Sequence, residues 1–349
     1  MKKIVTIVVI MAMLLALCAG CGNSGKDDGK GVVNVYNWGE YIGEDIVAQF
    51  EKETGIKVNY KTYDTNEALY SVLKQGGVSY DVIIPSDYMI SRMISEDMLE
   101  KIDFGNIPNM SLIEDQWSGM EYDPSGEYSV PYLSGTVGII YNTTMIDEEI
   151  TSWSALFDEK YSGQILMFDN SRDAIGIALK YLGYSLNTTN KAELDEAFEL
   201  LLNQKPLLQG YVMDQIFDKL ESGEAAIGPY YAGDYLTMVE NNPDLAFVVP
   251  EEGSNRFVDA MCIPKGAENK ANAEAFINFM CKTEIALENA DYVGYTSPNK
   301  EVEALLELDE ESAMISYPDE KTLSRCEFFV NLPQDILDAY DDYWVRLKT

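Results

Sequence analysis

The chain has 349 residues without a single histidine, and its 59 acidic and 25 basic side chains give a formal charge of −34. The absence of histidine excludes Ser-His-Asp and Cys-His catalysis and removes the commonest zinc ligand, so we expect no metal, no cofactor and no catalytic residue. The acidic balance disfavours nucleic acid and anionic lipid as partners, because both would be repelled, whereas a cationic ligand would be attracted.

The first twenty residues have the layout of a signal peptide. Lys2 and Lys3 precede an apolar run, 4–17, that is too short to cross a bilayer comfortably. The run ends in CAGC, where small residues precede Cys21 as lipoprotein signal peptidase requires, although Cys18 stands where leucine is usual. We therefore expect residues 1–20 to be removed and Cys21 to carry a lipid that anchors the protein to the cell membrane outside the cytoplasm, on its periplasmic or outer face. The alternative is an ordinary secretory leader with an incidental cysteine.

The rest of the chain divides into a tether and a large body. Residues 22–31 have no apolar side chain and are expected to form a flexible tether. The remaining body of roughly 318 residues exceeds the usual size of one hydrophobic core, which predicts two domains. Its cysteines, Cys262, Cys281 and Cys326, lack C-x-x-C spacing, so one disulfide and three buried thiols are both compatible with the sequence.

Two sets of alternating strands and helices are predicted along this body. Because the strands are separated by helices of about ten residues, we expect an α/β fold with mainly parallel sheets. The first set comprises strands at 32–38, 56–60 and 81–85 with helices at 44–54 and 66–75. The second comprises strands at 137–141, 165–168, 225–229 and 245–250 with helices at 173–181, 191–202, 213–221 and 271–282.

Aromatic and acidic side chains follow several of these strands. The segments NWGEY (37–41), PSDY (85–88) and DNSRD (169–173) come after strands, and FVD (257–259) precedes an apolar run. In an open parallel sheet the ligand binds beyond the carboxyl ends of the strands. A flexible polyammonium chain suits such a site, because its methylene groups pack on aromatic rings and its ammonium groups require carboxylates once they leave water. Any one of these motifs alone is more often core or surface than a binding site.

Longer segments carry a family resemblance. In order along residues 32–348, VVNVYNWGEYI, FEKETGIKVNY, YDVIIPSDY, YSVPYLSGTVGIIYN, LKYLGYSLNTT and VGYTSPN closely resemble the spermidine/putrescine-binding proteins of bacterial ABC importers. The resemblance implies a two-lobed periplasmic-binding-protein fold (type II-like) with discontinuous lobes. Lobe one would hold 32–136 plus 260–305, and lobe two would hold 137–259 plus 306–349.

The resemblance also implies a set of ligand-binding residues. Asp259 matches the family's acid that anchors an amine, and the other matching positions are Trp38, Glu40, Tyr41, Ser86, Tyr88 and Asp173.

Four positions depart from the family pattern. Tyr231 and Phe257 stand where tryptophan is frequent, and Phe329 replaces a polar amide. Asn170 replaces an aspartate of the spermidine binders, which predicts that putrescine competes better here relative to spermidine. The alternative is that Asp169 or Asp87 supplies the missing charge and spermidine stays preferred.

These features predict capture of spermidine or putrescine by a monomeric protein that delivers it to an ABC permease and its ATPase. One alternative is a binding protein of the same fold for a sugar, a peptide or ferric ion. The other is a secreted enzyme using two carboxylates, such as Glu40 and Asp259. The sequence offers such an enzyme no nucleophile with a base and no metal, so we expect a binding protein.

Overall fold

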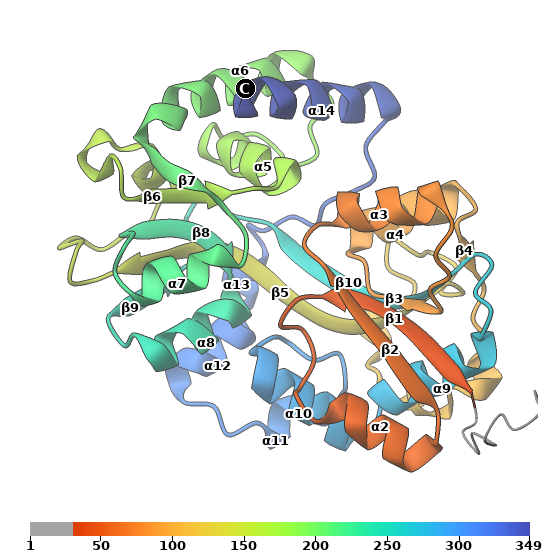
Figure 1. Cartoon of the computed structure of the whole chain (residues 1–349). Coiled ribbons are helices and arrows are strands. Elements are labelled where there is room, and N and C mark those ends of the chain that lie inside the picture. Colours follow the sequence, from red (N-terminus) through yellow and green to blue (C-terminus); the bar gives the residue numbers. More distant parts are fainter. Residues whose placement is uncertain (1–30) are drawn as a thin grey trace, which may run out of the picture.

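The computed structural model describes residues 31–349, in which two α/β lobes lie on either side of a central pair of strands (Figure 1). The signal peptide, Cys21 and most of the tether lie outside the described residues. Within residues 31–349, hydrogen-bonded strands follow the order β2-β1-β3-β10-β5-β8-β6-β7, with β4 beside β10 and β9 beside β5. The strands are β1 Val32–Trp38, β2 Lys57–Tyr63, β3 Val82–Ile83, β4 Leu99–Glu100, β5 Ser129–Asn142, β6 Ile165–Phe168, β7 Leu208–Val212, β8 Ile227–Tyr231, β9 Leu245–Val248 and β10 Arg256–Pro264.

Helices cover the sheet in both lobes. Helix α14 packs beside α6 in lobe two, after a segment in which α10 and α11 lie beneath lobe one and α12 packs against α8 of lobe two (Figure 1). The helices are α2 Ile46–Thr54, α3 Asn66–Gln75, α4 Asp87–Ser95, α5 Ser171–Tyr181, α6 Lys191–Gln204, α7 Gln215–Glu221, α8 Ala232–Asn241, α9 Lys270–Met280, α10 Thr283–Val293, α11 Val302–Leu305, α12 Glu310–Ser316, α13 Glu320–Leu323 and α14 Gln334–Lys348.

The sheet is mixed rather than mainly parallel. As predicted, β1 pairs in parallel with β2 and β3, and β6 pairs in parallel with β7 and β8. Strands β5 and β10, however, run antiparallel to each other and to their outer neighbours. The physical reason is that these two strands carry the chain between the lobes, so no helical crossover forces a parallel arrangement.

Strand β5 extends from one lobe into the other. Its first half, up to Thr136, pairs with β10, and its second half, from Val137, pairs with β8 and β9. Only the second half was predicted as a strand. The two halves therefore link the lobes through continuous backbone.

The hydrophobic cores are assembled from distant segments. In lobe one, Phe50 of α2 packs edge-to-face on Phe276 and Phe279 of α9, with ring centroids 5.1 and 5.4 Å apart. In lobe two, Tyr340 and Leu347 of α14 join the core of residues 137–245. The lobes are thus discontinuous, and their residue bounds stay a prediction.

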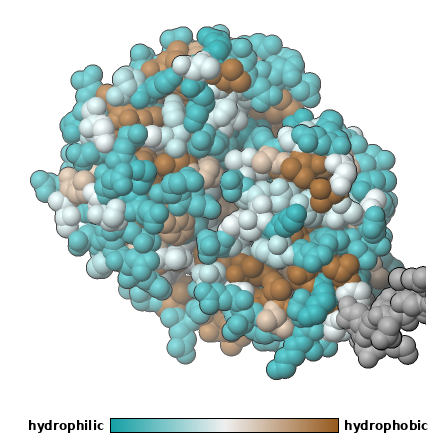
Figure 2. Space-filling view, in the orientation of Figure 1, coloured by the Kyte–Doolittle hydropathy of each residue, from teal (hydrophilic) through white to brown (hydrophobic). Residues whose placement is uncertain are grey.

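Hydrophilic residues cover most of the face seen in Figure 2, in keeping with the acidic composition. Between residues 31 and 349, helices long and apolar enough to span a membrane are absent. The three described cysteines are free thiols, with Cys262 and Cys281 buried and Cys326 half-buried.

We expect Gly253→Ala to be among the most destabilising single substitutions. Gly253 has φ +85°, and an added Cβ would lie 1.9 Å from the carbonyl oxygen of Arg325. The backbone strain and the overlap together should lower the free energy of unfolding by about 2 to 5 kcal/mol, measured by urea denaturation. Gly163→Ala is the matched control, because Gly163 has φ +80° with open space around it. An equal loss in both variants would contradict the steric argument.

Candidate ligand-binding site

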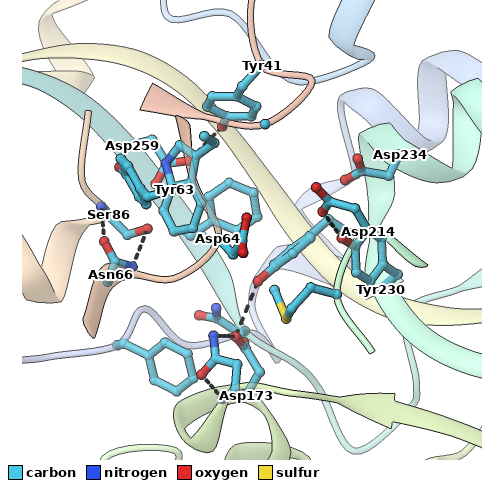
Figure 3. Close-up of a pocket in the computed structure, with 18 of the residues that line it drawn as sticks. Tyr41, Tyr63, Asp64, Asn66, Ser86, Asp173, Asp214, Tyr230, Asp234 and Asp259 are labelled. Atoms are coloured by element: carbon cyan, nitrogen blue, oxygen red, sulfur yellow. Dashed lines mark hydrogen bonds between the residues drawn. The ribbon is translucent and has the colours of Figure 1, made fainter. Parts of the chain in front are cut away.

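A cavity lies between the lobes where the carboxyl ends of β1, β2, β3 and β8 meet α5 and β10. Nine of its 21 lining residues are aromatic and six are aspartates, whereas lysine and arginine are absent from the lining. Figure 3 shows Asp259 and Ser86 on one side, Asp214 and Asp234 on the other, and Asp173 below. The lining consists of Trp38, Gly39, Tyr41, Tyr63, Asp64, Asn66, Ser86, Asp87, Tyr88, Asn170, Asp173, Met213, Asp214, Tyr230, Tyr231, Asp234, Asn255, Phe257, Asp259, Tyr295 and Phe329.

Asp259 presents a buried carboxylate oxygen that lacks a partner. Its Oδ2 accepts a 2.6 Å hydrogen bond from the Tyr41 hydroxyl, whereas its Oδ1 has no hydrogen-bond partner among the described residues. The residue is only 4% exposed. Burial raises the pKa of Asp259 to about 6, although the nearby Ser86 and the hydrogen bond from Tyr41 act in the opposite direction. A buried oxygen without a hydrogen-bond partner lowers the stability of the folded protein unless a donor or a cation binds to it.

Local strand geometry places Asp259. The register of β10 against β5 shifts between Asp259 and Ala260, as at a β-bulge. The loop after β3 is attached to the same stretch, because Ala260 N donates to Pro85 O at 3.1 Å. Asp87 adds a second attachment: its carboxylate accepts from the backbone N–H of Tyr88 at 2.6 Å and of Val258 at 3.2 Å.

Asp87 therefore differs from Asp259, since both of its oxygens are occupied by backbone donors. Burial raises the pKa of Asp87 to about 8, despite these two hydrogen bonds. Its contacts assign it to holding the loop and β10 together. It lines the cavity without offering a free oxygen.

Asp173 lies in the first turn of α5, on the opposite lobe. Its Oδ2 accepts from Asn170 Nδ2 at 2.7 Å and from the Tyr231 hydroxyl at 3.3 Å. Burial, followed by the charge of Glu67, raises the pKa of Asp173 to about 7.

A further acidic pair, which was not predicted, comes from lobe two. The Tyr230 hydroxyl donates to Asp214 Oδ1 at 2.9 Å, and the Tyr295 hydroxyl donates to Asp234. Burial, the largest cause, and the charge of Asp214 raise the pKa of Asp234 to about 7. The hydrogen bond from Tyr295 acts in the opposite direction and lowers this pKa.

Four of the six aspartates thus accept a hydrogen bond from a tyrosine hydroxyl. A hydroxyl holds a carboxylate in place without supplying the formal positive charge that lysine or arginine would bring. The lining therefore has no basic side chain that neutralises these carboxylates, and an incoming cation can do so. The four pairs are Tyr41–Asp259, Tyr231–Asp173, Tyr230–Asp214 and Tyr295–Asp234.

Aromatic rings form the remaining walls. Trp38 donates its indole N–H to Ile84 O at 2.8 Å and lies 4.6 Å from the Tyr63 ring, so its orientation is fixed. Tyr231 and Phe257 meet edge-to-face at 5.5 Å. Such ring faces can hold methylene groups and attract ammonium groups.

The structure brings together nine of the ten residues proposed as ligand-binding, and Glu40 is the exception. Glu40 is exposed, has φ 43°, and accepts a 3.4 Å hydrogen bond from the Tyr292 hydroxyl instead of lining the cavity. The role of Glu40 in ligand binding therefore stays a prediction. The nine residues in the lining are Trp38, Tyr41, Ser86, Tyr88, Asn170, Asp173, Tyr231, Phe257 and Asp259.

Asp169, the other candidate for a substitute charge, pairs with Lys348 at 2.8 Å and is not among the lining residues. Residues missed by the prediction include Asp64, Asp214 and Asp234. The segment YYAGD after the predicted strand 225–229 repeats the aromatic–acid pattern used elsewhere, so Asp234 could have been found.

Two α/β lobes with an acidic and aromatic cavity between them are the arrangement of a solute-binding protein. The chain belongs to the bacterial extracellular solute-binding protein family, whose model matches residues 45–316.

Similar proteins extend over nearly the whole chain. The spermidine/putrescine-binding periplasmic protein of Salmonella typhimurium is 34% identical over 97% of each chain, and that of Escherichia coli K12 is 33% identical over 95% of this chain and 96% of its own. A solved structure described as a putative spermidine/putrescine ABC transporter from Listeria monocytogenes is 40% identical, with a TM-score of 0.87 over 91% of this chain and 99% of that one.

Proposed function

We propose that this protein binds a polyamine, spermidine or putrescine, in the cavity between its lobes and delivers it to an ABC importer. The observation that carries the proposal is the cavity lining, which combines six aspartates with nine aromatic rings and lacks any basic side chain. Desolvated ammonium groups need carboxylates, and the intervening methylene groups need apolar walls. The names of the similar proteins point to the same ligand class.

The same lining argues against other solutes. An anionic ligand would be repelled by the aspartates, and a sugar has no charge for them to neutralise. The proposed ligand-binding residues are the nine predicted residues of the lining, with Asp214 and Asp234 added. The ligand is bound and released unchanged.

Delivery requires partners and a location outside the cytoplasm. The proposed partners are an ABC permease and its ATPase, which the lobes would meet once they have closed on the ligand. Cys21 is the proposed lipid anchor, and it would join the first strand through the tether 22–31.

A thermal-shift screen of the purified protein tests the ligand class. The panel contains putrescine, spermidine, spermine, amino acids and sugars at equal ionic strength. A ligand that binds only the folded state raises the unfolding temperature. We expect a shift with one or more polyamines and none with sugars; a shift with sugars or neutral amino acids alone would overturn the proposal.

The lipid anchor gives a separate prediction. Cys21→Ser should release the protein from the membrane fraction or stall its processing, because the thiol that accepts the lipid is gone. Fractionation followed by immunoblotting checks this outcome. The control is Cys18→Ser, which should leave membrane retention unchanged. Normal cleavage and full membrane retention of the Cys21 variant would contradict the assignment.

A further inference from the structure

Asn66, a residue that was not predicted from the sequence, faces Ser86 at the wall of the cavity. Both belong to the cavity lining, and both are buried, with 4% and 9% of their surface exposed. Asn66 is the first residue of α3, whereas Ser86 directly precedes α4. Figure 3 shows a pair of hydrogen bonds between the two side chains, on the same side of the cavity as Asp259. Asn66 thus connects the start of one helix to the loop that carries a proposed ligand-binding residue.

The backbone of Ser86 fixes the orientation of the Asn66 amide. The N–H of Ser86 can only donate, and it lies 3.1 Å from one atom of the amide, which must therefore be the oxygen Oδ1. The other atom, Nδ2, then donates to Ser86 Oγ at 3.0 Å. Ser86 Oγ is consequently an acceptor toward Asn66, and its own hydrogen must point elsewhere.

The acceptor that lies next to Ser86 is Asp259. The two residues face each other in an isolated antiparallel bridge. Oδ2 of Asp259 accepts from the Tyr41 hydroxyl, whereas Oδ1 has no hydrogen-bond partner elsewhere in residues 31–349. Burial raises the pKa of Asp259, and Ser86 is the first of the two groups that act against this effect. The carboxylate of Asp259 is therefore the acceptor that the Ser86 hydroxyl can reach.

We propose that Asn66 is a positioning residue, which directs the Ser86 hydroxyl toward the carboxylate of Asp259 and so prepares that carboxylate for an ammonium group. The chain runs from Asn66 Nδ2–H to Ser86 Oγ, and from Oγ–H to Asp259. Hydrogen bonds in such a chain polarise one another, so the first bond strengthens the second. This inference rests on the proposed polyamine function, because it assigns a role within the same cavity.

A merely structural role would give a different pattern. If Asn66 only tied α3 to the loop after β3, its loss would lower the stability of the fold, and the Ser86 hydroxyl would be irrelevant to the effect. Asn66→Ala removes both hydrogen bonds to Ser86 but keeps the N-cap of α3, where Thr65 accepts from Ala68 N at 3.1 Å. Because alanine is favourable in a helix, we expect this variant to fold.

We expect Asn66→Ala to weaken the binding of putrescine and of spermidine alike, by about two- to tenfold at pH 6 and by less at pH 8. The expected loss is the scale of one net hydrogen bond. The pH matters because a weaker bond from Ser86 lets Asp259 keep its proton up to a higher pH, and a protonated carboxyl does not attract a cation. Isothermal titration calorimetry at several pH values measures the affinities.

A double-mutant cycle isolates the part of the loss that depends on the hydroxyl. Ser86→Ala removes the hydroxyl, so adding Asn66→Ala to it should change the affinity by less than about twofold. The matched control is Thr65→Ala, which weakens the start of the same helix at a residue outside the cavity lining. This control should lower the unfolding temperature and leave the affinity and its pH dependence unchanged.

Three results would each overturn the role of Asn66. They are wild-type affinity and pH dependence in Asn66→Ala, an equal loss from Asn66→Ala with and without the Ser86 hydroxyl, and the same loss in Thr65→Ala. All three leave the polyamine function standing, since that function fails only if the wild-type protein binds no polyamine.

Discussion

Asp259→Asn should weaken polyamine binding by about 2 to 5 kcal/mol, roughly 30-fold to several-thousandfold. The change removes the charge next to a buried ammonium group and replaces the unpartnered oxygen, or its neighbour, with an N–H donor. Isothermal titration calorimetry of wild type and variant measures the effect. Trp38 and the other ring walls stay intact, so the loss is attributable to the carboxylate.

The same substitution should leave the fold intact. Because burial raises the pKa of Asp259, the ionised carboxylate destabilises the empty folded protein near pH 7.5. The uncharged amide of asparagine does not have this destabilising effect. We expect the empty variant to unfold at the wild-type temperature or above it. Asp169→Asn is the control: Asp169 lies just before α5 but outside the cavity lining. It should change the affinity less than about twofold. Wild-type affinity in the Asp259 variant would place the ammonium site elsewhere.

Affinity should rise strongly with pH between 5 and 8. The pKa values of Asp259, Asp173 and Asp234 are raised to about 6, 7 and 7, so these acids are largely protonated in the empty protein at pH 5. Alkylammonium groups stay protonated throughout this range, since their pKa resembles that of lysine at about 10.4. Binding of a cation therefore releases protons from these carboxylates. For each proton released, the affinity rises about tenfold per pH unit. We expect at least about a 100-fold gain from pH 5 to pH 8 by calorimetry.

The stability of the empty protein should change in the opposite direction. These carboxylates hold their protons more tightly in the folded than in the unfolded state, where the pKa is near 3.8. Their contribution to the free energy of unfolding is complete below about pH 4 and is lost as the pH rises through 6 to 7. The unfolding temperature without ligand should fall over this range while the ligand-induced increase grows. In Asp259→Asn the pH slope of the affinity should be shallower. A flat affinity in the wild type would contradict the role of these acids.

Local features of the fold were predictable where short-range signals determine them. Helix α3 has the predicted bounds because Thr65 accepts from Ala68 N at its start and Gly76 ends it. Strand β5 was predicted only in part, since its first half is set by pairing with β10, more than a hundred residues further along the chain. Pairing between strands so far apart in the chain does not change the local spacing of apolar residues, so it cannot be predicted from that spacing.

Part of the binding site was also predictable from the sequence, and part of it required the structure. Trp38 ends β1, as its motif predicted, whereas Asp259 lies within β10, a strand that was not predicted to include it. Glu40 belongs to the same motif as Trp38, yet its backbone turns to φ 43° and exposes the side chain. The engagement of Asn170 with Asp173 also required the structure, because the sequence does not show which way an N-cap amide points.

The most direct test of the account is a calorimetric titration of the purified wild-type protein with putrescine beside 1,4-butanediol, which has the same length without charge. The account predicts that putrescine binds at one site per chain, more tightly at pH 8 than at pH 5, and that the diol shows no measurable binding. Equal binding of the two compounds, or no binding of putrescine and spermidine at pH 8, would contradict the claim that the cavity carboxylates recognise a polyamine.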